Sequence, residues 1–145
     1  MNRKWSVLGG AAGAVALLAA SFAAAQDEDS PLHKIMEKVQ ANNATIIKGV
    51  RTAVSYKKAQ SDVAKSAQEL VKLGKEAKPL GEGPAKAQKK SVDEWNQLID
   101  AFIKQAEDFA ALTAKSDTPQ PKAKEAYKAV TKSCTACHDV FRVEE

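Results

Sequence analysis

Apolar residues recur along this chain at steps of three, four and seven, which is the spacing of one face of an α-helix. The first stripe follows Ser30-Pro31, a serine that can cap free N–H groups and a proline that suits the first helical position. It predicts a helix from Pro31 to about Arg51, in which Gly49 costs some stability. The stripe runs through Leu32, Ile35, Met36, Val39, Asn43, Ile46 and Val50.

A second stripe predicts a helix from about Ala53 to Leu73, with Gly74 as its stop signal. Its inward residues are Tyr56, Ala59, Val63, Ala67, Leu70 and Val71. Residues 75–86 contain two glycines and two prolines and predict a connection, whose length favours a crossover or loose loop over a tight turn.

A third helix is expected from about Ser91, which lies three residues before Glu94 and fits a capping box. Its stripe is the widest and most aromatic, comprising Val92, Trp95, Leu98, Ile99, Phe102, Ala106, Phe109 and Ala110. After a break at residues 116–121, a fourth stripe begins near Pro121 and continues through Ala123, Ala126, Tyr127, Val130, Cys134, Cys137 and Phe141. No strand-like alternation of any length occurs. Four amphipathic helices, each about 30 Å long, predict an all-α four-helix bundle.

The first 25 residues have the layout of a secretory signal peptide: a basic start, a run of apolar and small residues, and an Ala-x-Ala site at residues 23–25. The alternative is a membrane anchor, but the apolar run is short for the ~20 residues of a spanning helix. We therefore expect a bundle domain at residues 26–145. Cleavage would remove Arg3 and Lys4 and lower the formal net charge from +4 to +2. The sequence has no basic run interleaved with aromatic residues, which is the pattern typical of nucleic-acid binders, so we do not expect nucleic-acid binding.

The fourth stripe ends in the segment Cys134-Thr135-Ala136-Cys137-His138, which has the spacing for covalent attachment of a c-type haem. Each thiol adds across one vinyl group, and the adjacent imidazole becomes the proximal iron ligand. Helical spacing places Cys134, Cys137 and His138 on one side. A thioredoxin-type dithiol would need a βαβ context, and a structural zinc would need a fourth ligand, for which only His33 remains. The motif therefore predicts one haem c, and we expect the haem-free protein to be much less stable.

The segment from Ala126 to Arg142 resembles the end of the class II c-type cytochromes, the group that includes cytochrome c prime. These proteins carry the haem motif near the C-terminus, followed by an aromatic residue and an arginine. The resemblance extends more weakly to Trp95, to the phenylalanines of the third helix and to Met36. It implies that Phe141 packs against the porphyrin and that Arg142 pairs with a haem propionate, for which a guanidinium is suited. The alternatives that involve no haem are that Phe141 simply packs in the core and that Arg142 faces the solvent.

Members of this family are of two kinds. One kind has five-coordinate iron that binds small gases such as NO or CO, and the other has a methionine from the first helix as sixth ligand and carries electrons. Met36 follows Ile35 early in the first helix, where the resemblance places such a ligand, although methionine is also a common gap-filler in cores. His33 could compete as a ligand but is expected to be exposed, and Asn43 could hydrogen-bond in the pocket.

The resulting expectation is an electron carrier exported to the periplasm, without enzymatic activity and without stable membrane insertion after signal cleavage. Its partners would be redox proteins, and it would be a monomer or homodimer. The alternative is a gas-binding protein with an open sixth site. A peroxidase-like enzyme is disfavoured, because the sequence shows no distal histidine–arginine pair.

Overall fold

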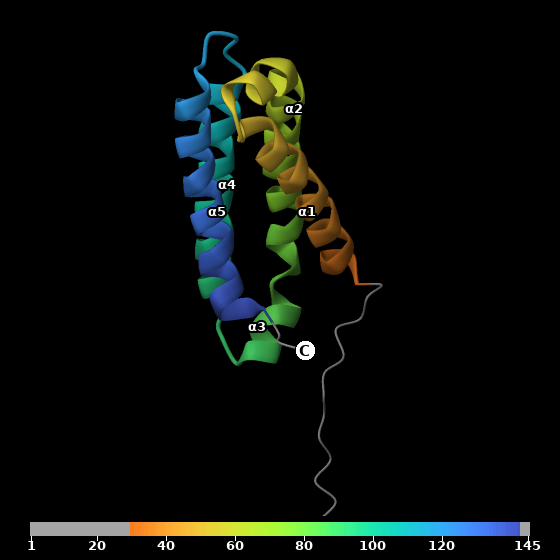
Figure 1. Cartoon of the computed structure of the whole chain (residues 1–145). Coiled ribbons are helices and arrows are strands. Elements are labelled where there is room, and N and C mark those ends of the chain that lie inside the picture. The colour runs from red at the N-terminus through yellow and green to blue at the C-terminus, as the bar shows by residue number, and fades with distance from the viewer. Residues whose placement is uncertain (1–29, 143–145) are drawn as a thin grey trace, which may run out of the picture.

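The computed structural model describes residues 30–142, which form helices and connections without a strand (Figure 1). The elements in chain order are α1 (Pro31–Val50), α2 (Ala53–Ala77), the 3-10 helix η1 (Lys78–Leu80), α3 (Glu82–Gln88), α4 (Val92–Thr113) and α5 (Gln120–Phe141). The all-α bundle prediction is confirmed. The expected signal peptide, residues 1–25, lies outside the described residues, and no helix within 30–142 is long and apolar enough to cross a membrane.

Local hydrogen bonds explain where the long helices begin. The Ser30 hydroxyl accepts from the His33 amide at 3.2 Å, and the Ser91 hydroxyl accepts from the Glu94 amide at 3.0 Å. α2 begins with a reciprocal cap between Thr52 and Ser55, directly after a two-residue turn. The serine cap expected at each of these helices is therefore confirmed, because capping depends only on neighbouring residues. Of the capping box expected at Ser91 only the serine half is found, and the Glu94 carboxylate accepts instead from Lys90 Nζ at 3.3 Å.

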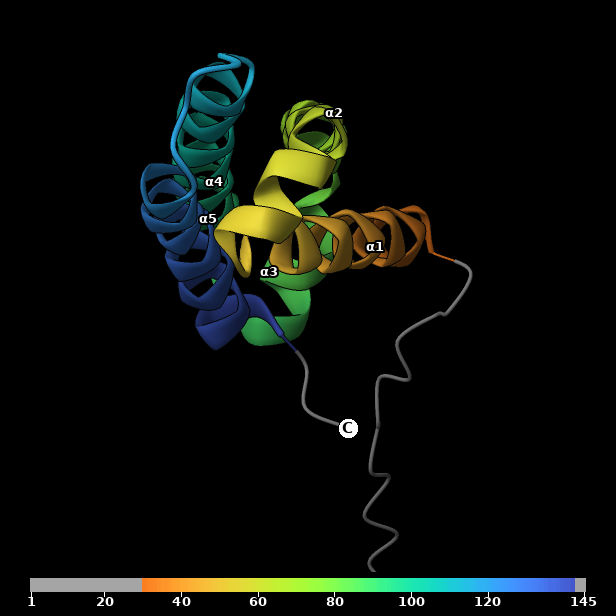
Figure 2. The ribbon, with the colours of Figure 1, turned by 45° about the horizontal axis from the view of Figure 1, so that its top comes forward.

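The long helices pack mainly on their neighbours in the chain: α1 on α2, α2 on α4, and α4 on α5. α1 and α5 meet over a much shorter stretch. Two views agree that the N-terminal half of α1 diverges from α5, while its C-terminal end comes closer (Figures 1 and 2). The bundle is thus closed at one end of the α1–α5 pair and splayed at the other.

Two groups of buried side chains hold these helices together. The main core lies among α1, α2, α4 and α5, and its fully buried members include Ile46, Val63, Leu70, Phe109 and Val130. A smaller cluster lies under the N-terminal half of α1. It comprises Ile35, Leu73 and Ala77, with the partly buried Leu32, Met36, Val39 and Leu80 packed against it.

The connection predicted for residues 75–86 is wrong in detail. α2 continues through Gly74 to Ala77, and most of the remaining segment is helical as η1 and α3. A Cβ on Gly74 would lie 2.8 Å from Ile103 Cγ1 and 2.9 Å from Phe102 Cε1. This glycine therefore lets α2 approach α4 closely and does not end the helix. Gly49 does the same for α1 and α2, since a Cβ there would overlap the Val63 side chain.

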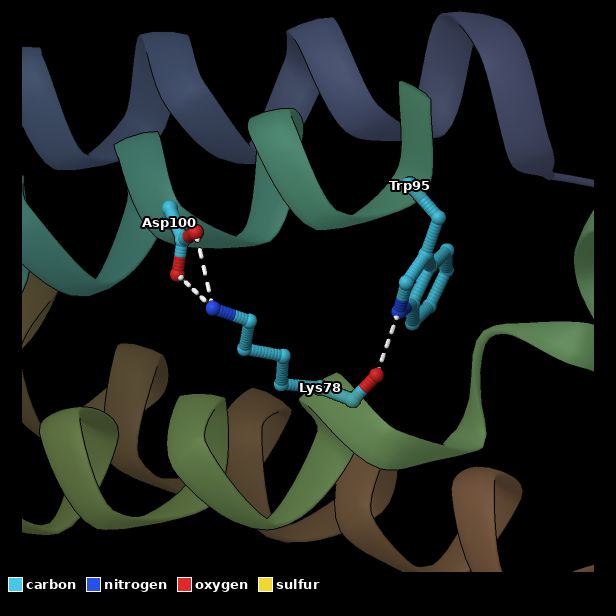
Figure 3. Close-up of polar contacts among 3 residues, drawn as sticks. All are labelled: Lys78, Trp95 and Asp100. Atoms are coloured by element: carbon cyan, nitrogen blue, oxygen red, sulfur yellow. Dashed lines mark hydrogen bonds and ion pairs between the residues drawn. The ribbon is translucent and has the colours of Figure 1, made fainter. Parts of the chain in front are cut away.

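Trp95 links several helices at the end of the bundle where α1 and α5 diverge. Its indole Nε1 donates to the Lys78 carbonyl at 3.0 Å, and Lys78 Nζ contacts both Asp100 carboxylate oxygens at 2.7 and 2.8 Å (Figure 3). The Trp95 ring meets Phe141 edge to face, with 5.3 Å between centroids. Through this one side chain η1, the start of α4 and the end of α5 are held together.

Candidate haem site

α5 carries the haem-attachment motif near its C-terminal end, and its three key side chains differ in exposure. Cys137 is buried with 8% of its surface exposed, Cys134 is half-buried, and His138 is exposed. The sequence placed all three on one side. Cys134 and His138 lie four residues apart and share a side, but Cys137 turns toward the core, because adjacent helical residues are rotated by about 100°.

Both thiols are free and strongly biased toward the protonated form. Burial and the neighbouring Cys134 raise the pKa of the Cys137 thiol to about 11, and burial also raises the pKa of Cys134. A thioredoxin-type dithiol depends on a thiol of lowered pKa at a helix N-terminus. These cysteines lie near a helix C-terminus, where the helix dipole disfavours a thiolate. The environment therefore opposes the redox-dithiol alternative.

The zinc alternative also lacks support in the described residues. Within residues 30–142 no three histidine, cysteine, aspartate or glutamate side chains gather as a metal would require. His33 lies at the start of α1 with 38% of its side chain exposed, and its Nε2 is 3.8 Å from a Glu37 carboxylate oxygen. It therefore does not supply the missing ligand near the cysteines.

A cavity of about 520 Å³ lies beside His138, at the junction of α3 with the end of α5. It is open to solvent, and most of the side chains around it are polar and exposed. The cavity is lined by Gln88, Thr135, His138, Asp139, Val140 and Arg142. Its wall therefore includes the imidazole that the motif assigns to the iron.

The surroundings of His138 favour the neutral imidazole. Partial loss of hydration lowers its pKa, the Arg142 charge lowers it further, and Asp139 opposes both effects. A neutral imidazole is the form that binds a metal. The arrangement thus keeps a ring nitrogen available for an axial bond at neutral pH.

These observations fit a covalently bound haem. Two free thiols lie three residues apart on one helix, a neutral imidazole follows the second, and a guanidinium suited to carboxylates lines the adjoining cavity. Comparison with protein-family models matched residues 31–142 to the family described as cytochrome C'. The chain belongs to the cytochrome C' family. The match runs from the first residue of α1 to the residue after α5, and membership implies a c-type haem. Comparisons with curated proteins and with solved structures gave no significant match.

Phe141 and Arg142 have different surroundings in this cytochrome C' chain. Phe141 is buried against Trp95 in the core, so its expected contact with a porphyrin stays a prediction. Arg142 is exposed at the cavity, and its carbonyl accepts a hydrogen bond from Gln88 Nε2 at 3.2 Å. Its pairing with a propionate also stays a prediction.

Sequence reasoning missed the remaining lining residues. Thr135, Asp139 and Val140 are within one turn of His138 and could have been found from helical spacing. Gln88 could not, because it belongs to a segment interpreted as a connection, and α3 brings it to α5 only in the folded chain.

Met36 lies on α1, half-buried against the small cluster of Ile35, Leu73 and Ala77. It is not among the residues that line the cavity beside His138. Asn43, the polar residue on the same inward line, accepts a hydrogen bond from the Tyr127 hydroxyl at 3.1 Å. Both residues thus lie on α1, whose N-terminal half diverges from α5 (Figure 2), and the assignment of Met36 as a distal ligand stays a prediction.

Proposed function

We propose that this cytochrome C' is an exported electron carrier. One haem c is bound through Cys134 and Cys137, with His138 as proximal ligand and Met36 as distal ligand. The observation that carries the proposal is that Met36 and His138 belong to the same end of the bundle. Met36 and Leu80 of η1 pack against the same small cluster, and the α3 helix that follows η1 reaches the cavity beside His138.

A haem c supplies reversible one-electron chemistry at its iron. The chain contributes the two thioether links, a neutral imidazole and a thioether sulfur, and histidine–methionine ligation raises the reduction potential relative to two nitrogen ligands. Arg142 would pair with a haem propionate. Partner redox proteins would approach the haem from the side of the cavity, where His138 and Arg142 are exposed.

Acid–base catalysis receives no support from the carboxylates of the described region. Asp100, Glu107 and Asp108 pair with lysines on exposed surfaces at 2.7–3.1 Å. Such pairs are solvated surface contacts that contribute little to stability. A carrier role requires no further catalytic group.

Gas binding is the second candidate. It is favoured by the half-buried position of Met36 against α2 and by the divergence of α1 from α5. If α1 keeps this distance in the haem-loaded protein, the sixth position stays open to NO or CO.

The absorption spectrum of the haem-loaded protein separates the two candidates. An electron carrier is expected to be low-spin, to show the weak far-red band of a methionine-ligated ferric haem and to bind CO slowly. Met36→Ala should convert it to a high-spin form that binds CO readily. Val39→Ala is the matched control, because Val39 also packs against the small cluster but has no ligating atom. A high-spin wild-type protein whose spectrum Met36→Ala leaves unchanged would establish the gas-binding alternative.

A further inference from the structure

We propose that the hydrogen bond between Tyr127 and Asn43 positions α1 against the haem and thereby controls how firmly Met36 holds the iron. The inference rests on the proposed function, which assigns Met36 as the distal ligand. Tyr127 and Asn43 are positioning residues in this proposal, since neither would contact the iron.

The bond joins the two helices that carry the proposed ligands. The Tyr127 hydroxyl on α5 donates to Asn43 Oδ1 on α1 at 3.1 Å, although the residues are 84 positions apart in the chain. A second link lies at the far end of this helix pair, where Gln120 Nε2 donates to the Val50 carbonyl at 2.6 Å. Among the described residues, α1 and α5 are thus linked at the last residue of α1 and again two turns earlier.

The Tyr127–Asn43 link is the nearer of the two to the proposed ligands. Met36 lies seven residues before Asn43, about 10 Å along α1, and His138 lies eleven residues after Tyr127, about 16 Å along α5. Beyond the link, in the direction of both ligands, the helices diverge (Figures 1 and 2). The link therefore lies at the point from which the two helices diverge. A small change in the angle between α1 and α5 there would move Met36 relative to His138.

The two partners of the bond are supported unequally. Tyr127 is 9% exposed and belongs to the main core, where its ring meets Phe109 with 5.5 Å between centroids. Asn43 is half-buried, and the N-terminal half of its helix rests on the small cluster under α1. The Tyr127 side chain is therefore held in place by the core. Because the less firmly packed Asn43 bonds to it, the hydrogen bond fixes the position of α1 relative to α5.

Tyr127→Phe tests the proposal because it keeps the ring in the core and removes only the donor. Loss of one hydrogen bond of ordinary net strength shifts an equilibrium by roughly fivefold. In the haem-loaded ferrous protein we expect CO association to become about fivefold faster, since CO must wait for the methionine to leave. A high-spin fraction should appear in the ferric spectrum. Asn43→Ala should reproduce both changes, and the double variant should add little to either.

Gln120→Leu is the matched control. It removes the other hydrogen bond between the same two helices, farther from the proposed ligands. It should lower the unfolding midpoint while leaving the CO association rate and spin state unchanged. Equal acceleration in Gln120→Leu and Tyr127→Phe would show general loosening of the bundle and would overturn the proposal.

Met36→Ala distinguishes failure of this inference from failure of the proposed function. If Met36→Ala accelerates CO binding and Tyr127→Phe does not, the positioning role is refuted while Met36 remains the ligand. If Met36→Ala changes neither spectrum nor CO binding, the ligand assignment fails and the positioning role fails with it. Should Tyr127→Phe not fold, Asn43→Ala decides by the same criteria, because its side chain is only half-buried.

Discussion

Gly81→Ala should destabilise the protein through the packing of a single side chain, Trp95. Gly81 has φ −72° and ψ −17°, which alanine adopts without strain, so the backbone does not oppose the change. A Cβ at this position would lie 2.6 Å from Trp95 Cγ and 2.7 Å from Nε1. The indole cannot easily yield, because it is 3% exposed, bonded to the Lys78 carbonyl and packed against Phe141.

The expected magnitude follows from three contributions. Overpacking of a well-packed site costs about 1–3 kcal/mol. A shift that breaks the indole hydrogen bond to the Lys78 carbonyl costs about 1 kcal/mol more. Replacing glycine by alanine reduces the conformational entropy of the unfolded chain, which stabilises the folded protein by about 0.4–1 kcal/mol. The net expectation for Gly81→Ala is a loss of about 1–3.6 kcal/mol in the free energy of unfolding.

Gly83→Ala is the matched control for this substitution. Gly83 lies two residues further on, within α3, and a Cβ there would meet nothing within 4 Å. Pro84 follows directly and disfavours a helical alanine before it, which opposes the gain from replacing a helical glycine. The same change should therefore alter the free energy of unfolding by less than about 1 kcal/mol. Urea unfolding of the haem-loaded variants, followed by far-UV circular dichroism, measures both values. Near-UV circular dichroism adds a local probe, because Trp95 is the one tryptophan of residues 26–145. Equal stability of the two variants would refute the reasoning that Gly81 is required by the indole.

Further predictions concern helix packing, capping and haem attachment. Gly74→Ala should lower the free energy of unfolding by about 1–3 kcal/mol in urea titrations, because its Cβ would crowd α4; a stabilised variant would contradict this. Thr52→Ala removes the reciprocal cap with Ser55 and should cost about 1 kcal/mol, detectable as a lower thermal midpoint, whereas an unchanged midpoint would show that the cap is dispensable. Replacing both Cys134 and Cys137 by alanine should leave any bound haem extractable by acidified organic solvent, whereas the wild-type protein should retain its haem, and release from the wild-type protein would exclude covalent attachment.

Helix positions could be predicted from the sequence to within a few residues in most cases. α1 was expected to end near Arg51 and ends at Val50, and α4 was expected to begin after Ser91 and begins at Val92. These elements are determined by apolar spacing and capping residues, both of which are local. The end of α2 was mispredicted because Gly74 serves the approach of α4, a role that involves residues far away in the chain.

The candidate site divides in the same way. The Cys134-to-His138 motif and its place on the fourth helix are visible in the sequence, because five neighbouring residues carry the chemistry. Its electrostatic setting is not visible there. That burial raises the pKa of Cys137 and lowers the pKa of His138 depends on how α5 packs at its end.

The sequence by itself thus determined an all-α chain with a haem-attachment motif on its last helix. Only the tertiary structure decided that α3 brings Gln88 to Arg142, that α1 diverges from α5, and that Asn43 meets Tyr127. The physical reason is that helix formation and haem attachment depend on residues a few positions apart. A hydrogen bond between residues 84 positions apart exists only once packing has placed two helices side by side.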